Sequence, residues 1–261
     1  ERHTISTAPA IHVLQLTHQQ RQRLNQRFAQ GTPRAETQPP ACLSSKTPCP
    51  STSQPWLIVG NPKMPEIGDP PAALSPLPGA ETEAQAISDL FKIRPLIGAE
   101  ANKATVVERM QSARVIHLAT HGFLDDYRGL GVPGAIALAP DGQPRRGEID
   151  GLLTASEILQ LDLVADLVVL SACDTGLGQI RGDGVIGLSR SLISAGAPSV
   201  IVSLWNVPDD ATNQLMQSFY QNLKQSGIDK AQALRQAMLT TKQTFPNPRD
   251  WAAFSLIGEA E

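Results

Sequence analysis

The sequence predicts an α/β fold, a three-layer α/β/α sandwich built around a mostly parallel sheet of six strands. Short apolar runs alternate with amphipathic helical segments along the chain, which is typical of strands joined by crossover helices. The apolar runs are continuous rather than alternating, as expected for strands covered on both faces. With 261 residues, of which 41% are hydrophobic, the chain is also large enough to bury such a core.

The first part of the chain differs in character from the rest. Residues 8–28 carry good helix formers and a charged amphipathic face, which indicates a helix. Residues 30–55 contain six prolines and many Ser and Thr residues without periodicity, which indicates a flexible loop. We therefore expect a division into an N-terminal helix and Pro/Ser-rich loop at 1–54 and a main domain at 55–261.

The main domain is expected to alternate strands and helices to its end. Ala84, Ile87 and Phe91 share one helical face. Asp229 is expected to cap the helix at 229–243, because its side-chain oxygen can accept a hydrogen bond from the first turn. Residues 135–148 suggest a hairpin, and the Thr154–Glu157 pattern is a capping box that opens a short helix. The predicted strands are 56–62, 93–98, 114–120, 166–172, 199–205 and 251–258, and the predicted helices are 79–91, 102–112, 183–195, 209–225 and 229–243.

Composition excludes several classes of protein. The 22 basic and 25 acidic residues give a net charge of −3, which disfavours nucleic acid or an anionic membrane as the main partner. No apolar run approaches the ~20 residues of a membrane span, and the first thirty residues lack a secretory apolar region. We expect an intracellular, cytoplasmic protein. The start at Glu1 suggests a piece of a longer polypeptide.

The three cysteines indicate neither a disulfide framework nor a metal site. Cys42 and Cys49 lie in the Pro/Ser-rich stretch, whereas Cys173 follows an apolar run. Their spacing matches no metal-ligand pattern, so we expect no metal and no other cofactor, and Cys173 is expected to be a free thiol.

Two chemically active side chains follow two predicted strands. His121 follows the strand at 114–120 and Cys173 follows the strand at 166–172, and the two residues are 52 positions apart in the sequence. Chemistry collects at the carboxyl ends of parallel strands, and an imidazole beside a thiol raises its thiolate fraction. Taken alone, each residue fits a packing role, but their joint placement favours a His/Cys dyad. His117, deeper in the same strand, is the competing histidine and is expected to be a core residue.

Several motifs together resemble one known family. The segments "HLATHG", "LTASEI", "LVVLSACDTGLG", "GDGVIGLSRSLISAGAPSVIVSLWNVPD" and "WAAFSLIG" resemble the CHAT family, caspase-like domains often attached to tetratricopeptide repeats. The likeness runs from about residue 55 to 258. More widely, the sequence is similar to the caspase, separase and gingipain group of cysteine peptidases.

This resemblance implies a cysteine endopeptidase that cleaves a protein substrate. His121 would be the general base and acid and Cys173 the nucleophile, with the backbone N–H groups of Gly122 and Cys173 as the oxyanion hole. The resemblance also implies a caspase-like sheet and an upstream tetratricopeptide-type repeat domain or other regulatory partner. The implied substrate-binding residues are Ser203, Leu204 and Trp205, which would pair with an extended peptide, and Asp174 and Asp183, which could select a basic side chain.

Other readings of the sequence remain open. Ser171 stands where related peptidases have Gln or Asp, so the motif does not define the preferred substrate residue. The chain could instead be a catalytically latent caspase-like scaffold or switch. "GDGVIG" at 182–187 fits a dinucleotide fingerprint, but about ten residues separate it from the preceding strand. Ser189 lacks the second glycine of a nucleophile elbow.

Overall fold

The computed structural model describes most of the main domain and one N-terminal helix. It covers residues 11–29, 56–68, 70–123, 134–142, 149–171, 182–225 and 227–260, with the backbone alone for 11–14, 27–29 and 182–186.

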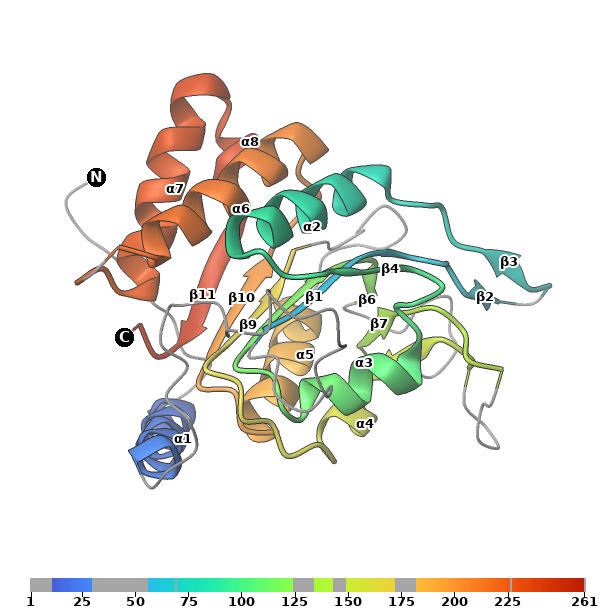
Figure 1. Ribbon diagram of the computed structural model, residues 1–261, viewed down its shortest axis with the longest axis horizontal. Helices are drawn as coiled ribbons and strands as arrows, with labels where there is room; N and C mark the ends of the chain where they lie inside the picture. The colour runs from blue at the N-terminus through green and yellow to red at the C-terminus, as the bar shows by residue number, and fades with distance from the viewer. Residues whose placement is uncertain are drawn as a thin grey trace, which may run out of the picture.

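The centre of the fold is a six-stranded sheet (Figure 1), as the sequence predicts. All neighbouring strands run parallel except the last strand, which pairs antiparallel with β10. The order across the sheet is β11 (Phe254–Gly258), β10 (Ser199–Ser203), β9 (Leu167–Leu170), β5 (Val115–Ala119), β1 (Trp56–Pro62) and β4 (Leu96–Gly98).

Helices cover both faces of this sheet, which completes the predicted three-layer sandwich (Figure 1). Successive side chains of a strand point to opposite faces, so Leu57 and Val59 of β1 join one core and Ile58 joins the other. One face packs against α2 (Pro78–Phe91), α6 (Asp209–Leu223) and α7 (Lys230–Thr244), which the short α8 (Pro248–Trp251) follows; the other packs against α3 (Lys103–Met110), α4 (Ala155–Ile158) and α5 (Gly182–Ser194).

Side-chain caps define where several helices begin. The Asp229 carboxylate accepts a hydrogen bond from Gln232 N at 2.7 Å, so the predicted cap of α7 is confirmed. The predicted capping box is also confirmed, because Thr154 and Glu157 exchange side-chain and backbone hydrogen bonds. Burial raises the pKa of Glu157, but hydrogen bonds from Lys103 and Thr154 outweigh this effect and lower it overall.

The hairpin expected at 135–148 is wrong, because its first strand belongs to a second, smaller sheet. It consists of β6 (Gly122–Phe123), β7 (Ala135–Ala137) and β8 (Leu152–Thr154), with β7 in the middle. Both edges of β7 are therefore occupied by strands from outside the 135–148 segment, and a local hairpin would have to displace one of them. A separate two-stranded pair, β2 (Glu66–Ile67) and β3 (Ala72–Ala73), lies in the loop after β1.

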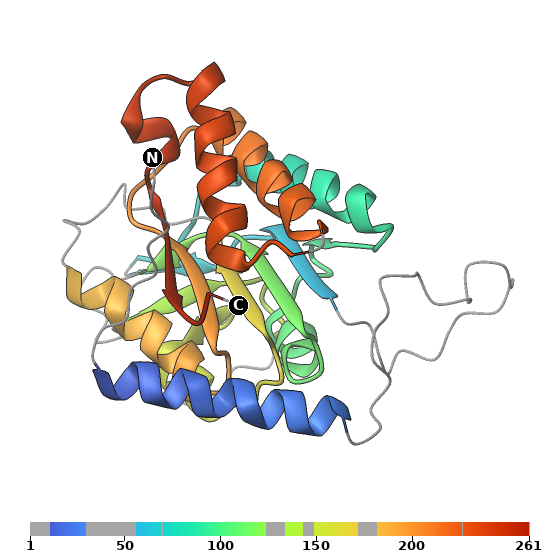
Figure 2. The same ribbon diagram turned by 90° about the vertical axis from the view of Figure 1, so that its left-hand side faces the viewer.

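The N-terminal helix α1 (Ile11–Ala29) lies on the opposite side of the sheet from α6 and α7 (Figure 2). Gln20 Nε2 donates to Ile193 O of α5 at 2.5 Å, and Thr17 Oγ1 donates to Glu259 Oε1 at 3.2 Å. Leu24 is 4% exposed. The predicted helix is confirmed and packs on the sandwich, while the division of the chain at residue 55 stays a prediction.

The side chain of Lys230, the first residue of α7, is buried. Its titration should therefore change the free energy of unfolding with pH. Burial and, to a smaller extent, the charge of Arg21 in α1 lower the pKa of Lys230 to about 8, although nearby carboxylates including Asp166 partly oppose the shift. The unfolded chain holds this proton up to about pH 10.4. Below pH 8 the folded state therefore carries the full cost of a buried charge, and this cost is relieved as pH rises from 8 to 10.4.

We expect Lys230→Met to be more stable than the wild type at pH 7, with the difference shrinking by about 3 kcal/mol at pH 10.5. Urea unfolding at both pH values measures it. Lys63→Met, at an exposed position, is the matched control and should show no such pH dependence. Parallel pH profiles for the wild type and Lys230→Met would contradict the expectation.

Among the described residues, no helix is both long enough and apolar enough to cross a membrane.

Candidate active site

The carboxyl ends of β5 and β9 meet at one edge of the central sheet. The two strands are parallel neighbours, with Leu118 opposite Leu170, and Ser171 N donates to Leu118 O at 3.0 Å. His121 lies two residues beyond the end of β5. Cys173 lies three residues beyond the end of β9 in sequence, outside the described residues. The two strands that precede the predicted dyad residues in the sequence therefore end next to each other.

His121 is held in place by backbone groups from two other segments. Its side chain is buried, with the residue 2% exposed, and Nε2 lies 2.7 Å from Ser75 O. His121 O accepts from Ala137 N at 2.9 Å, and the neighbouring Thr120 Oγ1 donates to Ala137 O at 2.7 Å. A carbonyl oxygen can only accept, so Nε2 carries the ring proton in this contact. Nδ1 is then the basic nitrogen of a neutral imidazole.

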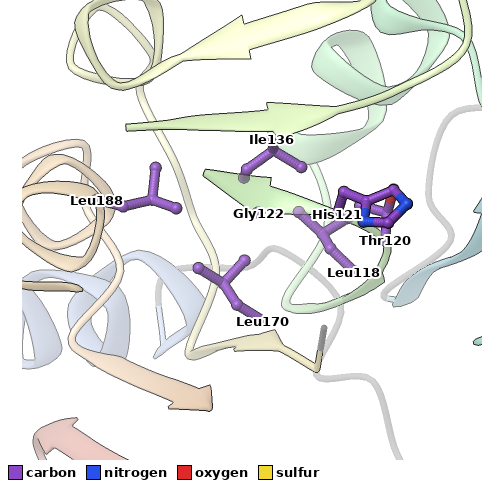
Figure 3. A pocket seen from close by; sticks show the side chains of 7 residues that line it. All are labelled: Leu118, Thr120, His121, Gly122, Ile136, Leu170 and Leu188. Atoms are coloured by element: carbon purple, nitrogen blue, oxygen red, sulfur yellow. The ribbon is translucent and has the colours of Figure 1, made fainter. Parts of the chain in front are cut away.

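A small hollow of about 10 Å³ lies beside this histidine (Figure 3). A cavity of this size is at the lower limit for a single water molecule. Figure 3 shows the His121 imidazole next to Thr120, with Leu188 on the opposite side of the hollow. Its lining residues are Leu118, Thr120, His121, Gly122, Ile136, Leu170 and Leu188.

His117 belongs to a buried polar chain, as expected for a core histidine. It is fully buried, with Nδ1 3.1 Å from Tyr220 Oη and Nε2 3.1 Å from Glu83 Oε1. Ser171 Oγ donates to the same Glu83 oxygen. This polar chain, Tyr220, His117, Glu83 and Ser171, joins α6, β5, α2 and the end of β9. It ends two residues before Cys173.

The protons of this polar chain can be assigned from its contacts. Burial raises the pKa of Tyr220 well above its ordinary value, and the nearby Glu83 charge raises it further, so its hydroxyl stays protonated. A hydroxyl that donates to His117 Nδ1 leaves the proton of a neutral imidazole on Nε2, facing Glu83. In this arrangement Nε2 of His117 lies 3.1 Å from Glu83 Oε1, and the same carboxyl oxygen accepts a hydrogen bond from the Ser171 hydroxyl.

A larger hollow, which we call the carboxylate pocket, lies on the other side of the β9 end. Its volume is about 140 Å³. Leu170 lines the small hollow and Ser171 lines the carboxylate pocket, as expected for successive residues at the end of a strand. The carboxylate pocket is lined by Leu77, Gly79, Ala80, Glu83, Ser171, Ser203, Trp205, Asn206, Val207, Asp209 and Thr212.

The structure brings two of the three predicted peptide-binding residues at the end of β10 to this pocket. Ser203 and Trp205 line it, whereas the Leu204 side chain packs on the opposite core. Ser203 Oγ donates to Trp205 O at 2.6 Å, and Trp205 Nε1 donates to Arg249 O at 2.8 Å. These two hydrogen bonds hold the turn at the end of β10.

The acidic residues proposed from sequence are not the ones described at the pocket. Asp174 lies outside the described residues, and the side chain of Asp183 in α5 is outside them as well. Glu83 and Asp209 line the pocket instead. Glu83 carried a sequence signal, because a charged residue stood on the apolar face formed by Ala84 and Ile87. Nothing local in the sequence marked Ser75 as the partner of His121.

The rival motifs do not form the sites they would need. The segment "GDGVIG" lies inside α5, which begins at Gly182, whereas a dinucleotide fingerprint places its glycines in the turn from strand to helix. Ser189 is fully buried in the middle of α5. Within the described ranges, no group of three His, Cys, Asp or Glu side chains could hold a metal ion.

The fold is that of the caspase-like cysteine peptidases. Gingipain R, an Arg-specific cysteine proteinase, superposes with a TM-score of 0.51 at 9% identity, covering 78% of this chain and 46% of gingipain R. The Saccharomyces cerevisiae separase–securin complex gives a TM-score of 0.52 at 14% identity, covering 98% of this chain and 14% of that one.

The chain belongs to the CHAT domain family, whose sequence model matches residues 1–259. Tetratricopeptide repeat protein 28 from Homo sapiens is 32% identical over 234 residues, which are 77% of this chain and 9% of that protein. The Mus musculus protein of the same name is 30% identical over 250 residues, 83% of this chain and 10% of that protein. The chain thus spans about a tenth of the length of these curated relatives.

Proposed function

We propose that this domain is a cysteine endopeptidase that cleaves a protein substrate with a dyad of His121 and Cys173. The observation that supports it most directly is the hydrogen bond from His121 Nε2 to Ser75 O at 2.7 Å. This contact orients the imidazole at the strand edge where the chain leads to Cys173 and makes Nδ1 its basic nitrogen. A general base needs this orientation before it can activate a thiol.

The chemistry then follows in two steps. His121 takes the thiol proton, and the Cys173 thiolate attacks the scissile carbonyl carbon to form a tetrahedral intermediate. The N–H groups of Gly122 and Cys173 stabilise its oxyanion. The imidazolium then protonates the leaving amine, and an acyl-enzyme forms. Water, deprotonated by His121, attacks this thioester and releases the second product with the thiol.

The end of β10 offers a docking edge for the substrate backbone. Among the described residues, β9 pairs with β10 as far as Leu170 and Val202, and β11 pairs with Ser203. An extended peptide would add along Ser203, Leu204 and Trp205, beyond these described pairs. Its scissile bond would lie toward the segment that begins at Ser171.

Regulation by an upstream segment forms part of the proposal. Both curated relatives are named for tetratricopeptide repeats, and the chain matches about a tenth of each. We therefore propose that a repeat domain or a partner protein controls activity. The second candidate function, a latent scaffold or switch, is favoured by the closed surroundings of His121, which is 2% exposed beside a hollow of about 10 Å³.

Labelling by a thiol-reactive peptide electrophile tests the proposal. We expect the wild type to be labelled at one cysteine and Cys173→Ala not to be labelled, whereas Cys42→Ala and Cys49→Ala should label at the wild-type rate. The experiment is run on this domain and on the longer protein, with and without candidate partners. Labelling that persists in Cys173→Ala would refute the dyad, and no Cys173 labelling in any form would favour the scaffold.

A further inference from the structure

We propose that the carboxylate pocket binds a lysine or arginine side chain, the one that immediately precedes the cleaved bond of the substrate. Its assignment to this substrate position rests on the proposed function. Its preference for a long cationic side chain rests on the pocket's own residues.

The pocket lies where a docked peptide would place that side chain. Ser171, on the segment leading to Cys173, forms part of its lining, and so do Ser203 and Trp205 at the end of β10. An extended peptide along β10 alternates its side chains between the two faces of the sheet. The residue next to the scissile bond can therefore turn toward the face covered by α2 and α6, where the pocket opens.

Two carboxylates give the pocket its charge. Glu83 is 3% exposed, accepts a hydrogen bond from Ser171 Oγ and lies 3.1 Å from His117 Nε2. Asp209, the first residue of α6, is exposed at the surface and packs against Gly79. A Cβ at position 79 would overlap the Asp209 carboxyl group, so this glycine leaves room for it. No lysine or arginine is found among the described residues that line the pocket.

The remaining lining suits the stem of a long side chain. Leu77, Val207 and the Trp205 ring supply apolar surface beside the carboxylates. Lysine and arginine bury their methylene stems on such surface and keep the charged head on polar groups. The volume of about 140 Å³ is several times what one water molecule needs. An acidic substrate side chain would bring a like charge toward the Glu83 carboxylate. An apolar substrate side chain would cover this carboxylate without offering it a hydrogen bond or an opposite charge.

Direct binding of small analogues tests the pocket without requiring catalysis. N-acetyl-arginine amide and N-acetyl-citrulline amide have nearly the same shape, but citrulline carries no charge. Each is titrated into the whole 261-residue chain while the indole N–H resonance of Trp205, assigned with Trp205→Phe, is followed by NMR. We expect the arginine compound to bind at least tenfold more tightly. Equal or tighter binding of the citrulline compound would overturn the inference.

Charge-removing variants locate the effect. Glu83→Gln keeps an oxygen that can accept from Ser171, and Asp209→Asn keeps the size of its side chain. Each should reduce the preference for arginine over citrulline severalfold, with circular dichroism confirming the fold. Asp210→Asn, the next residue of α6 and not part of the lining, is the matched control and should keep the wild-type preference. An undiminished preference in both pocket variants would also overturn the inference.

Peptide electrophiles separate this inference from the proposed function. Three probes differ only in arginine, leucine or aspartate before the reactive group, and labelling of Cys173 is measured for each. Fastest labelling by the arginine probe supports both proposals. Equal or faster labelling by the leucine or aspartate probe overturns the pocket inference and leaves the peptidase intact. Arginine-amide binding without labelling by any probe, both in this domain and in the longer protein with candidate partners, refutes the peptidase and supports a pocket for a basic side chain.

Discussion

Replacing His121 by Ala is expected to slow Cys173 labelling and peptide cleavage by at least ~100-fold, the effect typical of losing a general base. The fold should persist, because the sheet is held by strands and helices that do not depend on this side chain. The rates are measured in the form of the protein that labels most readily, with the melting temperature recorded alongside.

His117→Ala is the matched control, on the same strand. Its ring contacts Tyr220 and Glu83 in the core, so its loss should lower the melting temperature. The His117→Ala variant should keep a larger fraction of the wild-type labelling rate than His121→Ala does. If His117→Ala abolished labelling while His121→Ala kept it, the base would be His117 and the assignment proposed above would be wrong.

Glu83→Ala is expected to destabilise the fold by about 3–5 kcal/mol, the cost of breaking a buried charged contact by removing one partner. In this variant the buried Ser171 hydroxyl loses its acceptor, and His117 Nε2 loses the carboxyl group that lies 3.1 Å away. For a domain of this size, the loss corresponds to roughly 10 °C in melting temperature. Denaturant unfolding of the wild type and the variant measures the difference.

Glu83→Gln should lose much less, since its amide oxygen can still accept. A double-mutant cycle with His117→Ala isolates the contact between the two side chains and should give a coupling of at least about 1 kcal/mol. A Glu83→Ala variant within 1 kcal/mol of the wild type, or two additive losses, would show that this buried contact contributes little.

Much of the secondary structure could be predicted because its causes are local. The apolar run at 56–62 coincides with β1 (Trp56–Pro62), and the cap at Asp229 precedes α7 as expected. The prediction of a hairpin at 135–148 was wrong because strand pairing is not local. A short apolar segment indicates a strand but does not identify its neighbours, and β7 took its partners from β6 and β8, which are distant in sequence.

Local sequence patterns predict that strands end just before His121 and near Cys173, because hydrophobic periodicity and turn residues act over a few positions. The surroundings of those strand ends depend on contacts between residues that are far apart in the sequence. Ser75 and His121 are 46 residues apart, Glu83 and Ser171 are 88 apart, and His117 and Tyr220 are 103 apart. Such pairs meet because β5 lies between β1 and β9 and because α2 and α6 share one face of the sheet. Strand order and helix packing result from burying the whole core at once, and no local stretch of sequence encodes them.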